Sequence, residues 1–167
     1  MSSLVFTGEL TKWDLDSLQL VTGNVILHVS NRAELDGGVL DLHPNLIVEG
    51  NFFVRVDSSN VDKEEVTLEG PFAVGGVLNV LYQNGHHFES LEFVNLQQLG
   101  SSLLVDLDQT KLPGNGFVAF PSLRQVNGNA IIQARNGAST PSGGVYFGPS
   151  TLPWLICRFA HTSVAGS

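Results

Sequence analysis

Cysteine, positive charge and long apolar runs are all scarce in this sequence. The single cysteine, Cys157, excludes an internal disulfide and argues against a secreted, disulfide-stabilised domain. There are 8 Lys and Arg residues against 16 Asp and Glu, and the net charge of -8 argues against binding to a nucleic-acid backbone or an anionic membrane surface. No stretch approaches the roughly 18 consecutive apolar residues that a membrane span requires. We therefore expect no nucleic-acid partner and no membrane span.

Signals for export and for catalysis are equally scarce. The N-terminal residues show no basic segment followed by an apolar run, so we expect no signal peptide, and both the cytosol and a mature extracellular or virion fragment stay open. The sequence contains no Gly-x-Ser-x-Gly elbow and no phosphate-binding loop. We interpret Cys157 as a buried thiol that behaves as a small apolar residue. We predict no catalytic residue, no metal site and no cofactor.

What the sequence does contain is a nine-residue pattern that occurs five times. Its first copy is Val21-Thr-Gly-Asn-Val-Ile-Leu-His-Val29. Its third position is Gly23, Gly50, Gly76, Ser101 and Gly128, at steps of 27, 26, 25 and 27 residues. Steps of this size, within a range of roughly 20–50 residues, indicate stacked repeats. Asn follows the third position in three copies, and we expect these side chains to form a partial hydrogen-bonded ladder that Val77 interrupts.

Two short strands with period-two alternation are predicted in every repeat. The leading inward residues of the first strand are Val25, Phe52, Leu78, Leu103 and Ala130. The inward pairs of the second strand are Leu40 and Leu42, Val66 and Leu68, Leu91 and Phe93, Phe117 and Ala119, and Val145 and Phe147. A third buried column is predicted in the links at Leu46, Phe72, Leu96 and Leu123. Parallel stacking would bring equivalent residues to about 4.8 Å from one another.

The predicted fold is therefore all-β: a right-handed parallel β-helix, or solenoid, of about five coils of roughly 26 residues. β-hairpins are disfavoured because the strands are separated by about nine or ten residues rather than by a tight two-residue turn. We predict one domain over 1–167. Its first part, 1–17, would be an N-terminal half coil or cap. A closing rung is predicted at 153–160, and 161–167 would be a frayed tail.

Two stretches of the sequence are similar to the repeat of receptor L domains. They are Phe88-Glu-Ser-Leu-Glu-Phe-Val-Asn-Leu-Gln-Gln-Leu-Gly-Ser-Ser-Leu-Leu-Val105 and Phe120-Pro-Ser-Leu-Arg-Gln-Val-Asn-Gly-Asn-Ala-Ile-Ile132. L domains are short right-handed β-helices that are distantly similar to leucine-rich repeats. The resemblance implies a non-enzymatic module that binds a protein or a glycan on a sheet or on its loops. The chain departs from the family in lacking cysteine pairs and a clear amphipathic capping helix.

The middle outward residue of the first strand is large and apolar in four of the five repeats. We call this column the outer stripe, and it consists of Ile26, Phe53, Asn79, Leu104 and Ile131. A contiguous apolar patch on a protein surface usually marks an interaction site. We hypothesise that the stripe docks another protein or a second copy of this chain, with its four apolar residues as anchors and Arg55 and His28 at the rim. Cover by a terminal segment, or a misassignment of the inward and outward faces, would also explain the pattern.

Two further hypotheses rely on polar residues. A carbohydrate- or ligand-binding L-domain-like module would use the polar loop edge, through Asp57, Asn60, Asn84, His86 and His87. A polysaccharide-acting β-helix enzyme would use a stacked carboxylate column at Asp14, Asp41 and Glu92, although such enzymes need a longer groove than this chain supplies. The simpler interpretations are a solvated face for the carboxylates and a solvated loop for the two histidines, which have no third metal ligand at a suitable spacing.

Overall fold

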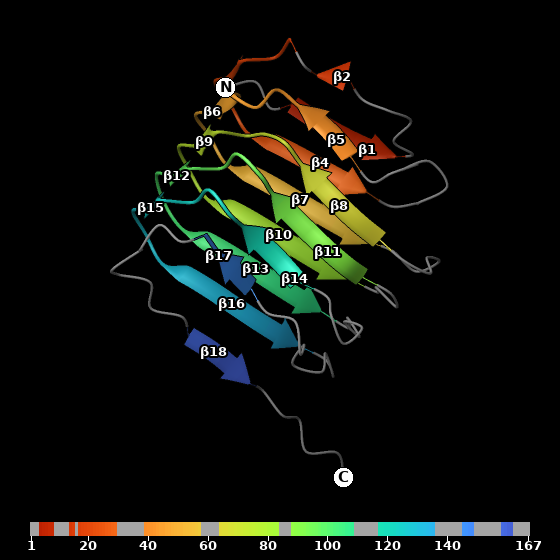
Figure 1. Cartoon of the computed structure of the whole chain (residues 1–167), viewed down its shortest axis with the longest axis vertical. Helices are drawn as coiled ribbons and strands as arrows, with labels where there is room; N and C mark the ends of the chain where they lie inside the picture. The colour runs from red at the N-terminus through yellow and green to blue at the C-terminus, as the bar shows by residue number, and fades with distance from the viewer. Residues whose placement is uncertain are drawn as a thin grey trace.

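The computed structural model describes residues 4–8, 14–15, 17–29, 39–57, 64–83, 88–108, 117–135, 145–148 and 158–161. Within these ranges the protein is all-β and contains no helix, and every pairing between strands is parallel. The strands form three sheets, which we call the first, second and third sheets. The chain enters them in turn and returns to each one strand further along (Figure 1).

The first sheet has seven strands in the order β1-β4-β7-β10-β13-β16-β18. Their bounds are Leu4–Gly8 (β1), Val25–Val29 (β4), Phe52–Asp57 (β7), Leu78–Gln83 (β10), Leu103–Asp108 (β13), Ala130–Arg135 (β16) and Arg158–His161 (β18). Alternating β-branched and large apolar residues favour these strands because they fit a pleated, half-buried surface. The predicted inward column is confirmed: Val25, Phe52, Leu78, Leu103 and Ala130 lie in register, and none is more than 6% exposed.

The second sheet has six strands in the order β17-β14-β11-β8-β5-β2. Their bounds are Asp14–Leu15 (β2), Val39–Leu42 (β5), Glu64–Leu68 (β8), Phe88–Phe93 (β11), Phe117–Phe120 (β14) and Val145–Phe147 (β17). In Figure 1 the arrows of this sheet point opposite to those of the first sheet. Each repeat therefore runs out along the first sheet and back along the second.

One predicted register in the second sheet is wrong by a single residue. Val118, rather than Phe117, stands beside Leu91, so the inward residues of β14 are Val118 and Phe120 instead of Phe117 and Ala119. Phe120 is fully buried, and its ring stacks against two others: the centroid distance is 5.1 Å to Phe93 and 5.7 Å to Phe147. The sequence hid this register because Phe-Val-Ala-Phe is apolar throughout and shows no alternation.

A second predicted register is shifted by two residues. Leu40 pairs with Leu68, where the repeat spacing had placed it beside Val66. A shift of two leaves every side chain on the same face of the sheet, because the side-chain period of a strand is two. Leu42 and Leu68 are accordingly both buried at 1% exposure, as the predicted inward pattern requires.

The third sheet was not anticipated, because two strands rather than three were expected in each repeat. It has the order β15-β12-β9-β6-β3, with bounds Leu20–Val21 (β3), Ile47–Val48 (β6), Ala73–Val74 (β9), Gln98–Leu99 (β12) and Gln125–Val126 (β15). Strands of two residues are too short to display a period-two alternation. Their inward residues are Val21, Val48, Val74, Leu99 and Val126, of which the first four are buried.

The apolar interior receives side chains from all three sheets and from the links between them. Leu46, Leu96 and Leu123, predicted as a buried column in the links, are at most 1% exposed, whereas Phe72 is half-buried. These three leucines join the inward residues of the sheets in one contiguous cluster. Burial of each large side chain contributes about 1.5–3 kcal/mol relative to an exposed position.

A short hydrogen-bonded ladder lies just before the first sheet. The Oδ1 atom of Asn24 accepts bonds from the backbone N–H (2.8 Å) and from Nδ2 (3.2 Å) of Asn51, whose own Oδ1 accepts from the N–H of Val77 at 2.8 Å. Two repeats further on, Ser102 Oγ accepts from the N–H of Asn129 at 3.1 Å. The expected partial ladder, interrupted at Val77, is confirmed.

Candidate functional site

The residues of the outer stripe lie side by side on consecutive strands of the first sheet. The pairings join Ile26 to Phe53, Phe53 to Asn79, Asn79 to Leu104, and Leu104 to Ile131. Ile131 is 38% exposed, and the other four are half-buried. Because strands in a sheet are about 4.8 Å apart, their side chains form one continuous row across the outer face.

The row is longer than the sequence analysis indicated. Val5 on β1 pairs with Ile26 and is 54% exposed, and on β18 the backbone of Arg158 pairs with that of Ile131. Val5 was missed because the segment 4–8 lacks the Val-x-Gly pattern that marks the other repeats. Its only sequence signal is a leucine and a phenylalanine two residues apart, which is too short a pattern to assign a strand.

A second row runs beside the outer stripe, two residues further along each strand. Its members with described side chains are His28, Arg55, Leu81 and Asp106. Arg55 is exposed and His28 is half-buried, as expected of rim residues. Asp106 is only 4% exposed although it lies on the outward face. The rim is therefore electrically asymmetric, with Arg55 and Asp106 flanking Leu81 on either side.

Two buried side-chain atoms on this face have no hydrogen-bond partner, and no other buried side-chain nitrogen or oxygen in the described ranges lacks one. They are Nε2 of His28 and Oδ1 of Asn79. An unpaired buried polar atom costs about 1–3 kcal/mol, so native structures seldom keep one without a functional or structural reason. Both atoms belong to the outer stripe and its rim, which makes this face chemically unusual as well as apolar.

The alternative ligand residues fall mostly outside the described part of the chain. Asn60, Asn84, His86 and His87 all lie there, so their arrangement stays a prediction. Asp57 is the last residue of β7, and its backbone pairs with that of Gln83 on β10.

The carboxylate column expected on the second sheet is not continuous. Asp14 and Asp41 pair in register, as predicted. Thr67, however, pairs with Val39 rather than with Asp41, and Glu92 follows Thr67 on the next strand. Glu92 is therefore out of line with the two aspartates because of the two-residue shift of β5. Among the described residues, no three His, Cys, Asp or Glu side chains gather closely enough to hold a metal ion.

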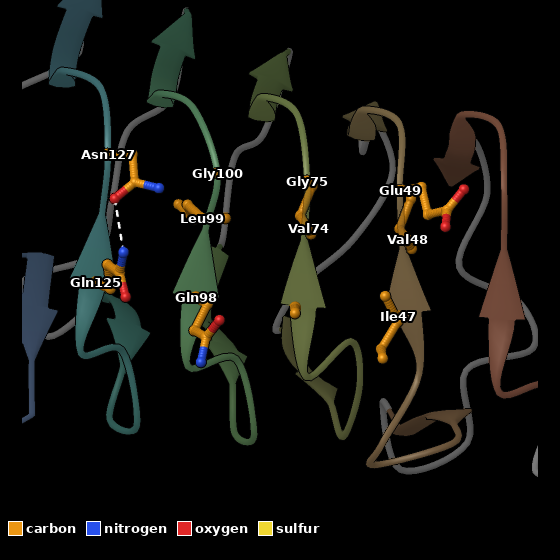
Figure 2. A pocket seen from close by; sticks show the side chains of 11 residues that line it. Ile47, Val48, Glu49, Val74, Gly75, Gln98, Leu99, Gly100, Gln125 and Asn127 are labelled. Atoms are coloured by element: carbon orange, nitrogen blue, oxygen red, sulfur yellow. Dashed lines mark hydrogen bonds between the residues drawn. The ribbon is translucent and has the colours of Figure 1, made fainter.

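A shallow hollow on the outer face of the third sheet was also missed by the sequence analysis. Its volume is about 320 Å³, and it crosses β6, β9, β12 and β15 (Figure 2). Ile47 and Glu49 border it on one side, and Gln125 and Asn127, joined by a hydrogen bond of 2.7 Å, border it on the other.

Two of the residues that line this hollow, Gly75 and Gly100, have no side chain, so the surface is depressed there. A Cβ atom on Gly75 would overlap the carbonyl oxygen of Glu49, and one on Gly100 would overlap that of Gly75. The close approach of neighbouring strands thus requires glycine at both positions. The hollow follows from this backbone geometry, and we assign it no ligand.

Comparison with protein-family models, with curated proteins and with solved structures finds no significant match. The similarity to receptor L domains accordingly rests on the repeat residues alone. Within the described ranges, no helix is long and apolar enough to cross a membrane.

Proposed function

We propose that this chain is a non-catalytic binding or assembly module, shaped as a right-handed parallel β-helix of about five coils. Its working surface would be the outer stripe, with Arg55 and His28 at the rim. The observation that carries the proposal is the register of the first sheet, which aligns Ile26, Phe53, Leu104 and Ile131 in one row on the outward face.

The order of the strands supports the helical form. Each repeat contributes one strand to the first sheet, one to the second and one to the third, and neighbouring repeats pair in parallel within each sheet. Parallel neighbours of this kind require a crossover through the rest of the repeat. Such crossovers are almost always right-handed in proteins, which is the basis for the proposed hand.

The chemistry of the row supports a role in docking. The second row beside it and Asn79 within it supply polar groups, whereas the anchors present flat aliphatic and aromatic surface. Interfaces commonly combine an apolar centre with a polar rim. A sheet face of this type can pack against another flat surface at a separation of about 10 Å.

The proposal is tested with the double variant Phe53→Ser/Leu104→Ser and a matched control, Leu20→Ser/Ile47→Ser. Leu20 and Ile47 are 52% and 44% exposed on the third sheet, so the control removes a similar apolar surface elsewhere. Light scattering of the purified chain and affinity capture from an extract of its source cells are the two readouts. Circular dichroism checks that both variants fold.

We expect the stripe variant to weaken association about 100-fold or more, because losing two anchors removes roughly 3 kcal/mol or more of binding energy. The control should associate like the unmodified chain. The proposal is wrong if neither readout detects association, or if both variants lose it equally.

A further inference from the structure

We propose that the partner at the outer stripe is a second copy of this chain. The two copies would dock face to face about a two-fold axis that runs parallel to β10, so that Asn79 meets Asn79 of the second copy. This inference rests on the proposed function and specifies the partner and the geometry of the same surface.

The strand order places the axis. β10 is the fourth of seven strands in the first sheet, with three strands on either side (Figure 1). A two-fold axis along β10 sets β7 against β13 of the second copy, and β4 against β16. Because the axis is parallel to the strands, a residue keeps its place along the strand when the copies are exchanged. A two-fold contact of this kind needs a surface that is complementary to itself.

The outer stripe meets that requirement in its apolar residues. Phe53 and Leu104 occupy equal distances on either side of Asn79, and each would meet the other across the interface. Ile26 and Ile131 form the next symmetric pair. Every apolar anchor therefore finds an apolar partner. The twist of packed sheets displaces strands far from the axis, so the pairs nearest β10 carry most of the contact.

The rim charges select this axis over the other in-plane one. Arg55 on β7 and Asp106 on β13 lie one strand to either side of Leu81 on β10. A two-fold axis along β10 sets β7 of one copy against β13 of the other, so that position 55 of each copy faces position 106 of the other. A two-fold perpendicular to the strands and through the outer stripe would instead set β7 against β7 and reverse the strand direction, so that Arg55 faces the position of Asn51, which carries no charge. Opposed unlike charges favour a docking arrangement, so only the axis along β10 places Arg55 opposite a carboxylate.

Asn79 supplies an independent observation at the axis itself. Its Oδ1 is buried and has no hydrogen-bond partner in the single chain. The terminal torsion of Asn is soft, so the amide can turn towards the surface at little cost. Across the axis, Nδ2 of each Asn79 would donate to Oδ1 of the other. A single Asn within an otherwise apolar contact fixes register in paired coiled-coil helices, and the same logic applies here.

The size of the face is sufficient for a dimer. Seven strands about 4.8 Å apart, each four to six residues long at about 3.3 Å per residue, give roughly 600 Å² on each copy. The total of about 1,200 Å² is at the lower end of stable interfaces. We therefore expect a dimer that dissociates on dilution rather than an obligate one.

The geometry predicts which positions can be cross-linked. In a Cys157→Ser background, the cysteine of Asn79→Cys would lie about 10 Å, one sheet separation, from its copy. The cysteine of Ile131→Cys would lie four strand spacings, about 19 Å, to the side of its own copy but directly opposite position 26. A thiol cross-linker with a short spacer distinguishes these cases.

We expect Asn79→Cys alone to cross-link to a dimer. Ile26→Cys and Ile131→Cys should each stay uncross-linked alone and should cross-link to one another when the two variants are mixed. Circular dichroism checks folding, and the mixed pair tests the same axis if Asn79→Cys does not fold. Cross-linking of Ile131→Cys alone, with none for the mixed pair, would overturn the axis while leaving the proposed function intact, whatever Asn79→Cys does. A purified chain that stays monomeric at every concentration would overturn self-docking, and the capture experiment would then decide the proposed function separately. Association that persists in Phe53→Ser/Leu104→Ser would reject both.

Discussion

At the scale of single residues, the position after the repeated glycine shows how side chains connect neighbouring repeats. Asn51 forms side-chain hydrogen bonds to the repeats on both sides of its own. It donates to Asn24 on one side and accepts from the backbone of Val77 on the other. A side chain of this kind takes the place of a backbone acceptor at a corner where the sheet ladder is interrupted.

Replacing Asn51 with Ala should lower the free energy of unfolding by about 1–3 kcal/mol, because the part-buried N–H of Val77 loses its acceptor. Asn129 occupies the equivalent position three repeats later and is exposed, so Asn129→Ala is the matched control. We expect the control to change the free energy by no more than about 0.5 kcal/mol. Urea unfolding measures both. Equal effects would show that the ladder does not stabilise the fold.

The sequence predicted this ladder because its donors and acceptors recur at the repeat spacing. It did not predict the unpaired Oδ1 of Asn79, because Asn at an outward position reads as an ordinary solvated residue. The predicted stripe already set Asn79 between Phe53 and Leu104, and the structure adds that the Oδ1 atom is buried there without a partner. The stripe could be predicted from sequence, and the burial of its central polar group could not.

At the scale of strands, the second sheet was harder to predict than the first. Its strands follow links of variable length, so the repeat spacing does not fix their register. β14 slipped by one residue and β5 by two relative to the expected alignment. The inward column of the first sheet was correct throughout, because the five strands that form it each begin two residues after the repeated glycine or serine.

The register of β14 gives a sharp prediction. Phe120→Ala should lower the free energy of unfolding by about 3–5 kcal/mol, because it removes the ring between Phe93 and Phe147 from a fully buried position. Phe117→Ala, which changes the same residue type on the same strand, should cost clearly less. Thermal or urea unfolding distinguishes the two variants. A larger loss for Phe117→Ala would restore the register first expected from the sequence.

The third sheet lay beyond sequence prediction for a different reason. Two-residue strands such as β6 and β12 contribute one inward and one outward side chain each, which is too few residues to show a period-two alternation in the sequence. Their inward residues were recognised as apolar members of the repeat, but not as a separate sheet. Leu20 and Ile47, exposed on this sheet, were missed with it.

At the scale of the whole molecule, the repeats stack in parallel, and each repeat contributes one strand to each sheet. That arrangement places the apolar residues in a shared interior, and it also aligns the outer stripe into a surface. The interior could be predicted from the repeat alone, because five inward positions recur together. The placement of β1 and β18 at the two edges of the first sheet, which leaves β10 as its central strand, came only from the structure.

The most direct test of this stacking is the distance between spin labels on the third sheet, away from the proposed interface. In a Cys157→Ser background, spin labels are attached to cysteines at two pairs of exposed positions. The first pair is Leu20→Cys with Gln98→Cys, and the second is Leu20→Cys with Gln125→Cys. The pairs are three and four strand spacings apart, so double electron–electron resonance should place the second pair about 4.8 Å further apart than the first. Equal distances, or a shorter distance for Gln125, would contradict the parallel stack.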